Sequence, residues 1–170
     1  MIHVANFLLD RLDAFGSHIV GVFGLMGSAF AVEMADWERD QATLRAIRET
    51  VFVDEQKVLP ELEWDGIDQD CLHVIAYTND RSAVGTGRLL RDGHIGRLAV
   101  LEPWRGQGAG SALLLKLIAI AKTRGINSIA LNAQIHALAF YERFGFVAEG
   151  SDFDDAGIPH RHMLLKESVK

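Results

Sequence analysis

The sequence has little cysteine and little positive charge. Its 170 residues contain a single cysteine, Cys71, which cannot form an intramolecular disulfide, so a reducing compartment such as the cytoplasm is expected. No second cysteine surrounds it, and Cys71 is interpreted as a small apolar residue rather than a nucleophile. Seventeen Lys and Arg against 23 Asp and Glu give a formal net charge of −6. This charge argues against nucleic acid as a partner, because a phosphate backbone attracts a basic surface.

Long apolar runs are also missing. A membrane-spanning helix needs about 20 apolar residues, whereas the apolar, glycine-rich stretch over residues 19–32 is shorter and is followed by Glu33. A signal peptide begins with a positively charged region, whereas this N-terminal segment carries the acidic Asp10 and Asp13. We therefore expect no membrane segment. Residues 1–29 are interpreted as an N-terminal extension, with two hypotheses: sequence upstream of the true translation start, or a helix packed on a partner subunit of a homodimer.

The apolar content is sufficient for one folded domain over residues 30–170. Hydrophobic residues make up 49% of the chain, which supplies a sizeable core. Patterning and turn residues predict strands at about residues 30–35, 72–78, 83–91, 94–101, 128–132, 146–150 and 161–165. The same criteria predict helices at about residues 38–51, 111–122 and 136–144, with an acidic connector over residues 54–70. A mixed α/β domain without internal repeats is expected.

Two glycines mark boundaries between these elements. Asp92-Gly93 is a strong hairpin signal, so the strands between residues 72 and 101 are expected to form an antiparallel meander. Gly125 stands where a helix C-cap is common. The helix before it carries apolar residues at helical spacing, interpreted as core: Leu113, Leu114, Leu117, Ile118 and Ala121.

A glycine-rich run, Arg105-Gly106-Gln107-Gly108-Ala109-Gly110, joins an expected strand to an expected helix. The first backbone N–H groups of a helix have no partner within it and lie at the positive end of its dipole, so phosphates bind there. Glycine removes the Cβ atoms that would hold a pyrophosphate away, and arginine adds a charge-assisted hydrogen bond. Taken alone, the run is explained equally well by an ordinary glycine-rich turn.

Two common nucleotide-binding motifs do not match this run. A phosphate-binding loop of the nucleoside triphosphatase type needs Lys-Ser or Lys-Thr after the last glycine, and Ser111-Ala112 stand there. A dinucleotide fold needs a third glycine where Ser111 stands and an acidic residue about 20 positions on, but the next expected strand ends at Asn132. The first motif is excluded and the second is weakened.

Two motifs in the right order resemble the GCN5-related N-acetyltransferase (GNAT) superfamily. Arg-x-x-Gly-x-Gly follows the strand Arg97-Leu98-Ala99-Val100, as in that superfamily's acetyl-CoA motif. Downstream, residues 129–134 and 139–146 resemble its strand, helix and closing FYxxxGF element. Residues 48–56, with the sequence RETVFVDEQ, are similar to one small bacterial branch. The resemblance covers roughly residues 30–170.

This resemblance implies a central, mostly antiparallel twisted sheet, splayed between its fourth and fifth strands, with helices on both faces. It also implies acetyl-CoA as co-substrate. The splayed strands leave backbone groups unpaired for the amides of the pantetheine arm, which assigns that arm to Leu98, Ala99 and Val100. The pyrophosphate is assigned to Arg105, Gly106, Gln107, Gly108, Ala109 and Gly110. Further cofactor-binding positions are Ser111, Asn132, Phe140 and Arg143.

The resemblance implies direct transfer of an acetyl group to an amine, without metal. Tyr141 matches the position of the general acid, which protonates the CoA sulfur. The base is open between His94, whose imidazole titrates in a useful range, Glu55, and a water relay. A backbone N–H of residues 98–100 is expected to hold the oxyanion, because a fixed dipole costs no reorganisation. His160 and His162 lie two apart, but no Cys, Asp or Glu completes a metal set.

The acceptor is expected to be a small amine, ahead of a peptide N-terminus. The connector has one lysine, Lys57, and an acidic bias that attracts an ammonium group, while Trp64 and Phe52 are candidate apolar walls. The acidic residues are Asp54, Glu55, Glu61, Glu63, Asp65, Asp68 and Asp70. The competing hypothesis is a non-catalytic acyl-CoA-binding sensor with the same fold, and a glycine-rich nucleotide-binding module is more remote. The presence of Tyr141 favours the enzyme.

Overall fold

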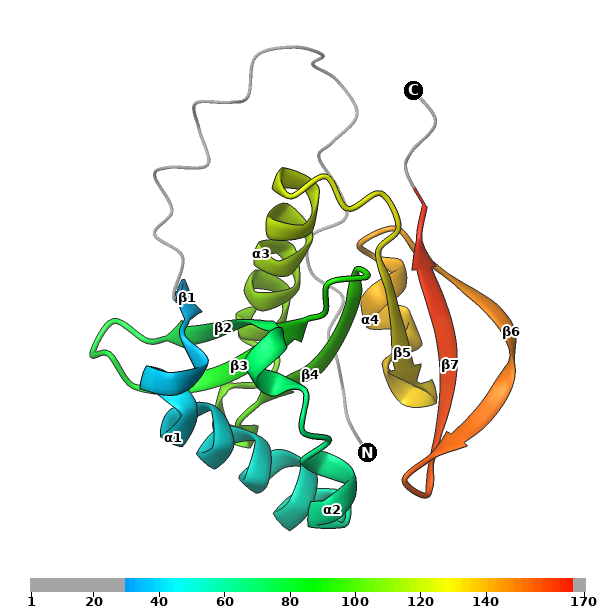
Figure 1. Cartoon of the computed structure of the whole chain (residues 1–170). Coiled ribbons are helices and arrows are strands. Elements are labelled where there is room, and N and C mark those ends of the chain that lie inside the picture. Colours follow the sequence, from blue (N-terminus) through cyan, green and yellow to red (C-terminus); the bar gives the residue numbers. More distant parts are fainter. Residues whose placement is uncertain (1–29, 167–170) are drawn as a thin grey trace.

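A seven-stranded sheet organises residues 30–166, the part of the chain that the computed structural model describes (Figure 1). The expected extension over residues 1–29 lies outside the described residues. Across the sheet the strands follow the order β1-β2-β3-β4-β5-β7-β6. Their bounds are β1 Ala31–Ala35, β2 Leu72–Tyr77, β3 Ala83–Leu89, β4 His94–Val100, β5 Ala130–Gln134, β6 Phe146–Asp155 and β7 Ile158–Leu165.

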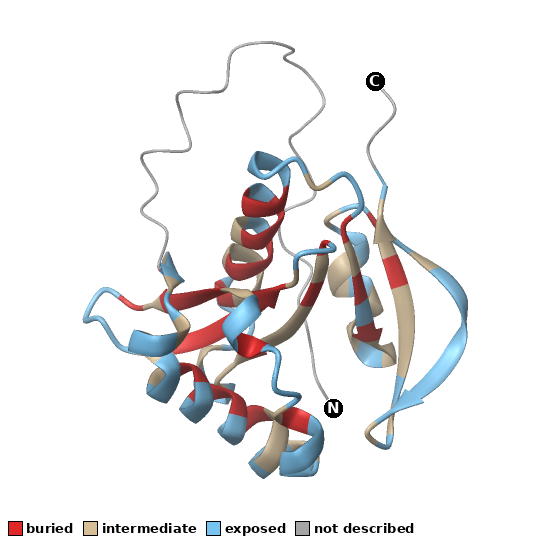
Figure 2. Cartoon of the chain, in the orientation of Figure 1, coloured by how far each residue is buried: buried red, intermediate tan, exposed pale blue. Residues whose placement is uncertain are grey.

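Helices cover both faces of this sheet. The α-helices of the described residues are α1 Trp37–Arg48, α2 Pro60–Glu63, α3 Ala109–Thr123 and α4 Leu138–Glu142. A π-helical segment, η1 Glu49–Glu55, continues α1. Three short 3-10 turns also lie in the described residues: η2 Asp68–Asp70, η3 Glu102–Trp104 and η4 Ile135–Ala137. The larger buried cluster packs α3 against the sheet, and a smaller cluster packs α1 and η1 against β4. In Figure 2 the buried positions concentrate on β2, β3 and one side of α3, whereas β6 is mostly exposed.

The expected antiparallel meander is confirmed. Strands β2, β3 and β4 pair antiparallel in sequence order. The hairpin between β3 and β4 closes where the Gly93 N–H donates to the Leu90 carbonyl at 3.1 Å. Gly93 has φ +95°, and a Cβ there would lie 2.0 Å from the Ser128 carbonyl oxygen. Only glycine fits this turn, both for its backbone angle and for its space.

The parallel pairing of β4 and β5 is short. Only His94 with Ala130 and Ile95 with Leu131 are in register, and beyond these residues the two strands part (Figure 1). Every other neighbouring pair in the sheet is antiparallel. The expected fold, a mostly antiparallel sheet splayed between its fourth and fifth strands, is confirmed.

Several expected boundaries were wrong, for local physical reasons. The first helix does not end at Val51, because Val51 and Ile47 both pack against Ala99 of β4 and the helical run continues as η1 to Glu55. The acidic connector contains α2 and η2 rather than only loop. The last two strands are longer than predicted, since β6 continues to Asp155 and β7 begins at Ile158. They form a hairpin that extends beyond the sheet and is too exposed to show an apolar pattern.

The region after α3 also differs slightly from the expectation. Gly125 follows the C-cap of α3 with φ +71° and donates to the Lys122 carbonyl at 3.0 Å, as expected. The next strand, β5, begins two positions later than predicted, and the helix after it divides into η4 and α4, ending at Glu142. Among the helices of residues 30–166, none is long and apolar enough to cross a membrane.

Candidate active site

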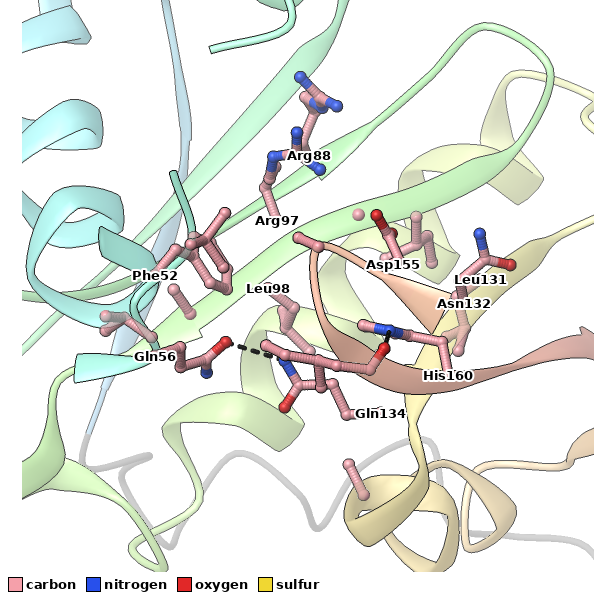
Figure 3. Close-up of a pocket in the computed structure, with 18 of the residues that line it drawn as sticks. Phe52, Gln56, Arg88, Arg97, Leu98, Leu131, Asn132, Gln134, Asp155 and His160 are labelled. Atoms are coloured by element: carbon pink, nitrogen blue, oxygen red, sulfur yellow. Dashed lines mark hydrogen bonds between the residues drawn. The ribbon is translucent and has the colours of Figure 1, made fainter. Parts of the chain in front are cut away.

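A cavity of about 590 Å³ lies where β4 and β5 part (Figure 3). Its walls come from β4, β5, α4, the end of η1 and the hairpin of β6 and β7. Of the site residues predicted from the sequence, the cavity is lined by His94, Leu98, Ala99, Val100, Arg105, Gly110, Asn132, Phe140 and Tyr141. The others lie outside its lining: Glu55, Gly106, Gln107, Gly108, Ala109, Ser111 and Arg143. The structure therefore brings most of the strand and helix candidates together around one cavity.

Strand β4 carries a bulge in the middle of this wall. Opposite β3, Thr86 pairs with Ala99 and Arg88 pairs with Gly96, so two residues of β4, Arg97 and Leu98, face a single residue of β3. Arg97 has φ +51°, the left-handed conformation that marks such irregularities. Because β5 pairs with β4 only at the start of the strand, the backbone groups of β4 that face β5 beyond the bulge have no partner strand among residues 30–166.

The glycine-rich run forms an open rim at the N-terminus of α3. Gly106 and Gly108 have φ +73° and +96°, and Gly108 is the N-cap. The Ala112 N–H donates to the Gly108 carbonyl at 3.0 Å, so the N–H groups of Ala109, Gly110 and Ser111 precede the first helical bond. A Cβ on Gly106 or Gly108 would meet no atom of the described residues within 4 Å. These N–H donors, the positive end of the α3 dipole and the open space beside them suit a phosphate group.

Arg105 and Glu55 form an ion pair at this rim. The Arg105 Nε donates to the Val100 carbonyl at 2.8 Å, and its Nη2 donates to Glu55 Oε2 at 2.5 Å. Glu55, a candidate base in the sequence, therefore faces the glycine-rich run and does not line the cavity. Its carboxylate serves to hold Arg105.

Tyr141 lies on α4 inside an aromatic cluster. Its ring centroid is 4.9 Å from that of Phe140 and 6.1 Å from that of Phe146, both edge-on. Burial raises the pKa of Tyr141 to about 12, because the phenolate would be desolvated. The phenol therefore keeps its proton over the physiological range and is available as a hydrogen-bond or proton donor at the cavity.

His94 lies at the start of β4, beside the cavity. Burial lowers the pKa of His94, and the nearby cationic Arg88 and Arg97 lower it further, whereas Asp92 opposes the shift. The ring is therefore neutral at pH 7 and can accept a proton. Of the two base candidates, His94 lines the cavity and Glu55 does not.

We expect the His94 imidazole to titrate below pH 6.5, its ordinary value. The folded protein disfavours the charged ring, so this group contributes stability above pH 6.5 that is lost as the pH falls through the lowered pKa. Histidine NMR titration measures this directly, with His94→Gln assigning the signal and the unfolded protein as reference. A His94 signal that titrates at or above pH 6.5 would contradict the burial argument.

Two glutamines bridge the cavity, and neither was predicted from the sequence to have a role. The Gln134 Nε2 at the end of β5 donates to the Gln56 Oε1, just after η1, at 2.8 Å (Figure 3). Because η1 packs against β4, this bond connects the two halves of the splayed sheet. Both residues fall inside the matched motifs, and that location is the only sequence signal that could have singled them out.

The acidic connector is largely neutralised by arginine, so the expected attraction for an ammonium group loses most of its basis. Asp70 pairs with Arg91. Ion pairs also join Glu63 to Arg48 and Arg97, Asp65 to Arg88 and Arg97, and Asp68 to Arg48 and Arg88. Phe52 lines the cavity as expected. Trp64 does not, since its ring lies under the guanidinium groups of Arg45 and Arg48.

The two strand histidines have separate environments. His160 lines the cavity, and its Nδ1 lies 2.8 Å from the Ile158 carbonyl oxygen. His162 Nδ1 lies 3.1 Å from the Asn132 Oδ1. Within residues 30–166, no group of three or more His, Cys, Asp or Glu side chains is arranged to hold a metal ion.

Comparisons with known proteins agree with this geometry. Residues 39–167 match the family model for the acetyltransferase (GNAT) domain. YjcF, an uncharacterised N-acetyltransferase of Bacillus subtilis (strain 168), is 37% identical over 122 residues, which are 69% of this chain and 86% of YjcF. The uncharacterised protein YyaT of the same organism is 34% identical over 129 residues, which are 72% of this chain and 86% of YyaT.

Solved structures show the same fold. An acyl-CoA N-acyltransferase from Pseudomonas aeruginosa aligns with a TM-score of 0.71 and 31% identity, over 81% of this chain and 99% of that chain. Escherichia coli ElaA also aligns with a TM-score of 0.71, at 27% identity, over 81% of this chain and 99% of that chain. The family match includes the cavity, the splayed strands and the loop before α3. The chain therefore belongs to the GNAT acetyltransferase family and is an acyl-CoA-dependent N-acyltransferase.

Proposed function

We propose that this enzyme transfers an acetyl group from acetyl-CoA directly to a primary amine on a small molecule. One observation carries the proposal: a proton donor, Tyr141, and a neutral base, His94, line the same cavity between the parted strands. When bound, acetyl-CoA supplies an activated thioester. The residues of this chain supply orientation, charge stabilisation and proton transfer.

Recognition of the two ends of acetyl-CoA is assigned to different parts of the site. The N–H groups of Ala109, Gly110 and Ser111, with Arg105 beside them, suit the pyrophosphate. The unpaired backbone of β4 at Leu98 suits the pantetheine amides, which take the place of a neighbouring strand. A β4 N–H beyond the bulge also suits the oxyanion, because a fixed donor needs no reorganisation during the reaction.

Proton transfer is assigned to side chains. An alkyl amine has a pKa of about 10.4 and is mostly protonated at pH 7, so its attack requires loss of a proton. His94, neutral and lining the cavity, accepts it directly or through a water. Tyr141 donates to the sulfur as the thiolate leaves. Glu55 is not assigned a proton-transfer role, because its carboxylate is bonded to Arg105.

The size of the cavity favours a small acceptor. Its volume of about 590 Å³ must hold the acyl end of the cofactor as well as the amine. Pockets for small ligands have volumes of about 300–1,000 Å³. The hairpin of β6 and β7 forms one wall of the cavity through Asp155, Ala156 and Ile158.

A thiol-release assay tests this proposal. We expect small primary amines to release CoA from acetyl-CoA faster than peptides with free N-termini do, each compared at equal concentration. Faster release with peptides would overturn the proposed acceptor class. Tight acetyl-CoA binding without release for any amine would replace the enzyme with an acyl-CoA-binding sensor.

A further inference from the structure

We propose that Arg97 is a positioning residue for this reaction, and that its ion pair with Glu63 holds the bulge of β4 so that the backbone after it faces the acyl group. The expected effect on turnover rests on the proposed acetyl transfer. The anchoring of the β4 bulge does not, because it concerns only residues of this chain.

The bulge places a non-glycine residue in an unfavourable conformation. Arg97 has φ +51° in the middle of a strand, where an extended backbone with negative φ is usual. Such a conformation persists only when surrounding contacts over-determine it. The contacts that hold this conformation matter, because they also determine the backbone position of Leu98 and Ala99, which follow immediately.

The side chain of Arg97 supplies those contacts. Its Nε lies 2.9 Å from Glu63 Oε2. Its Nη2 donates to the carbonyl oxygens of Leu62 at 3.2 Å and Glu63 at 3.1 Å, and to Asp65 Oδ2 at 3.2 Å. A planar guanidinium holds its donors in a rigid fork, whereas the donors of an ammonium group rotate on a flexible stem. The bulge of β4 is thereby fastened to the segment from α2 to η2.

That segment is itself held rigidly. Glu63 is only 2% exposed, and its Oε1 accepts from the Arg48 Nε of α1 at 2.5 Å. Asp68 Oδ1 accepts from Arg48 at 2.7 Å and from Arg88 of β3 at 2.8 Å. Asp65 joins Arg88 to Arg97, which Figure 3 shows on the same side of the cavity. Three guanidinium groups and three carboxylates thus form one network of balanced formal charge.

The geometry after the bulge depends on this network. Leu98 packs with the core around α3, and Ala99 packs with the cluster of α1 and η1 on the other face. Removing the extra residue of the bulge would shift the register by one and exchange these two faces. The same shift would redirect the N–H and carbonyl groups that line the cavity. Loss of the Arg97 anchor is therefore expected to impair turnover and to weaken the contacts of the pantetheine arm, while the pyrophosphate rim at the N-terminus of α3 stays intact.

The decisive variant is Arg97→Gly. Glycine accepts positive φ without strain, so the variant removes the anchor and leaves the backbone conformation accessible. We expect kcat to fall about tenfold and the Kd for acetyl-CoA to rise by a smaller factor, because the pyrophosphate rim is unaltered and misplaced groups cost most in the transition state. Guanidinium ion at low millimolar concentration is expected to restore part of kcat, whereas equal sodium chloride is not.

Two further variants complete the test. Arg97→Lys keeps the charge without the planar fork and is expected to remain impaired. Arg91→Gly is the matched control, because Arg91 lies in the turn before β4 and, within the described part of the chain, pairs only with the exposed Asp70. It is expected to keep the kcat of the unaltered enzyme. An Arg97→Gly enzyme with unchanged kcat, or one that guanidinium does not restore, would overturn the positioning role.

A readout without turnover separates this inference from the proposed function. In 1H–15N spectra of the enzyme without ligand, Arg97→Gly is expected to move the Val100 and Leu101 amide signals, whose residues are not sequence neighbours of the substitution, more than Arg91→Gly does. If no amine is acetylated but these signals move, the proposed function fails and the anchoring stands. If the signals do not move, the anchoring is wrong whatever the activity.

Discussion

Replacing Tyr141 with phenylalanine is expected to lower kcat by about 100-fold or more, with little change in the affinity for acetyl-CoA. The substitution removes only the hydroxyl, so the ring contacts with Phe140 and Phe146 remain. Without a donor, the thiolate leaves unprotonated and its charge is not stabilised. Steady-state kinetics by thiol release, together with calorimetric binding, measure the two effects separately.

The chain provides a matched control, because Tyr77 is its other tyrosine. Tyr77 lies at the end of β2, with Arg81 stacked on its ring, and it does not line the cavity. Tyr77→Phe is expected to leave kcat unchanged. Since burial raises the pKa of Tyr141 to about 12, its ionisation should produce no alkaline loss of rate below about pH 10. An unchanged kcat in Tyr141→Phe would remove this residue from the mechanism.

Replacing Gly108 with tryptophan is expected to weaken acetyl-CoA binding by at least about 100-fold, or about 2.7 kcal/mol. A side chain there enters the open space above the N-terminus of α3 and displaces the pyrophosphate from the free N–H groups. It also places a non-glycine residue at φ +96°, which costs about 1–2 kcal/mol of folding stability. Calorimetric titration measures the affinity, and thermal unfolding measures the stability.

The control for this change is Gly125→Trp at the other end of α3. Gly125 has φ +71° and, like Gly108, has no atom within 4 Å of an added Cβ. The two variants are therefore expected to lose similar stability, while only Gly108→Trp loses affinity. Equal affinity losses in both variants would mean that the glycine-rich run stabilises the fold and does not bind phosphate.

The fold could be predicted from the sequence, partly from local turn signals and partly from family resemblance. Asp92-Gly93 predicted the β3–β4 hairpin, and Gly93 has no room for a Cβ. The two motifs that flank α3 predicted the parted strands through family resemblance. Boundaries failed where packing decided them, as at Val51, which keeps the helical run against β4.

The pairing of charges could not be predicted. Arg105 meets Glu55 across 50 residues of sequence, and Arg97 meets Glu63 across a gap that contains two strands. Spacing predicts which residues share a helix or strand face, but not which distant carboxylate a guanidinium will reach. For the same reason, the acidic connector suggested an attraction for cations that the ion pairs largely cancel. The Gln56–Gln134 bridge is another contact between distant segments.

The most direct test of this account is calorimetric titration of the unaltered enzyme with acetyl-CoA, CoA and ADP. The pyrophosphate is assigned to the N-terminus of α3 and the pantetheine arm to the space between β4 and β5, so both parts are expected to contribute to affinity. We expect a micromolar Kd for acetyl-CoA, or about −8 kcal/mol, and much weaker binding of ADP. Equal affinity for ADP and acetyl-CoA, or no binding of acetyl-CoA, would contradict the assignment of the parted strands as the acyl-CoA site.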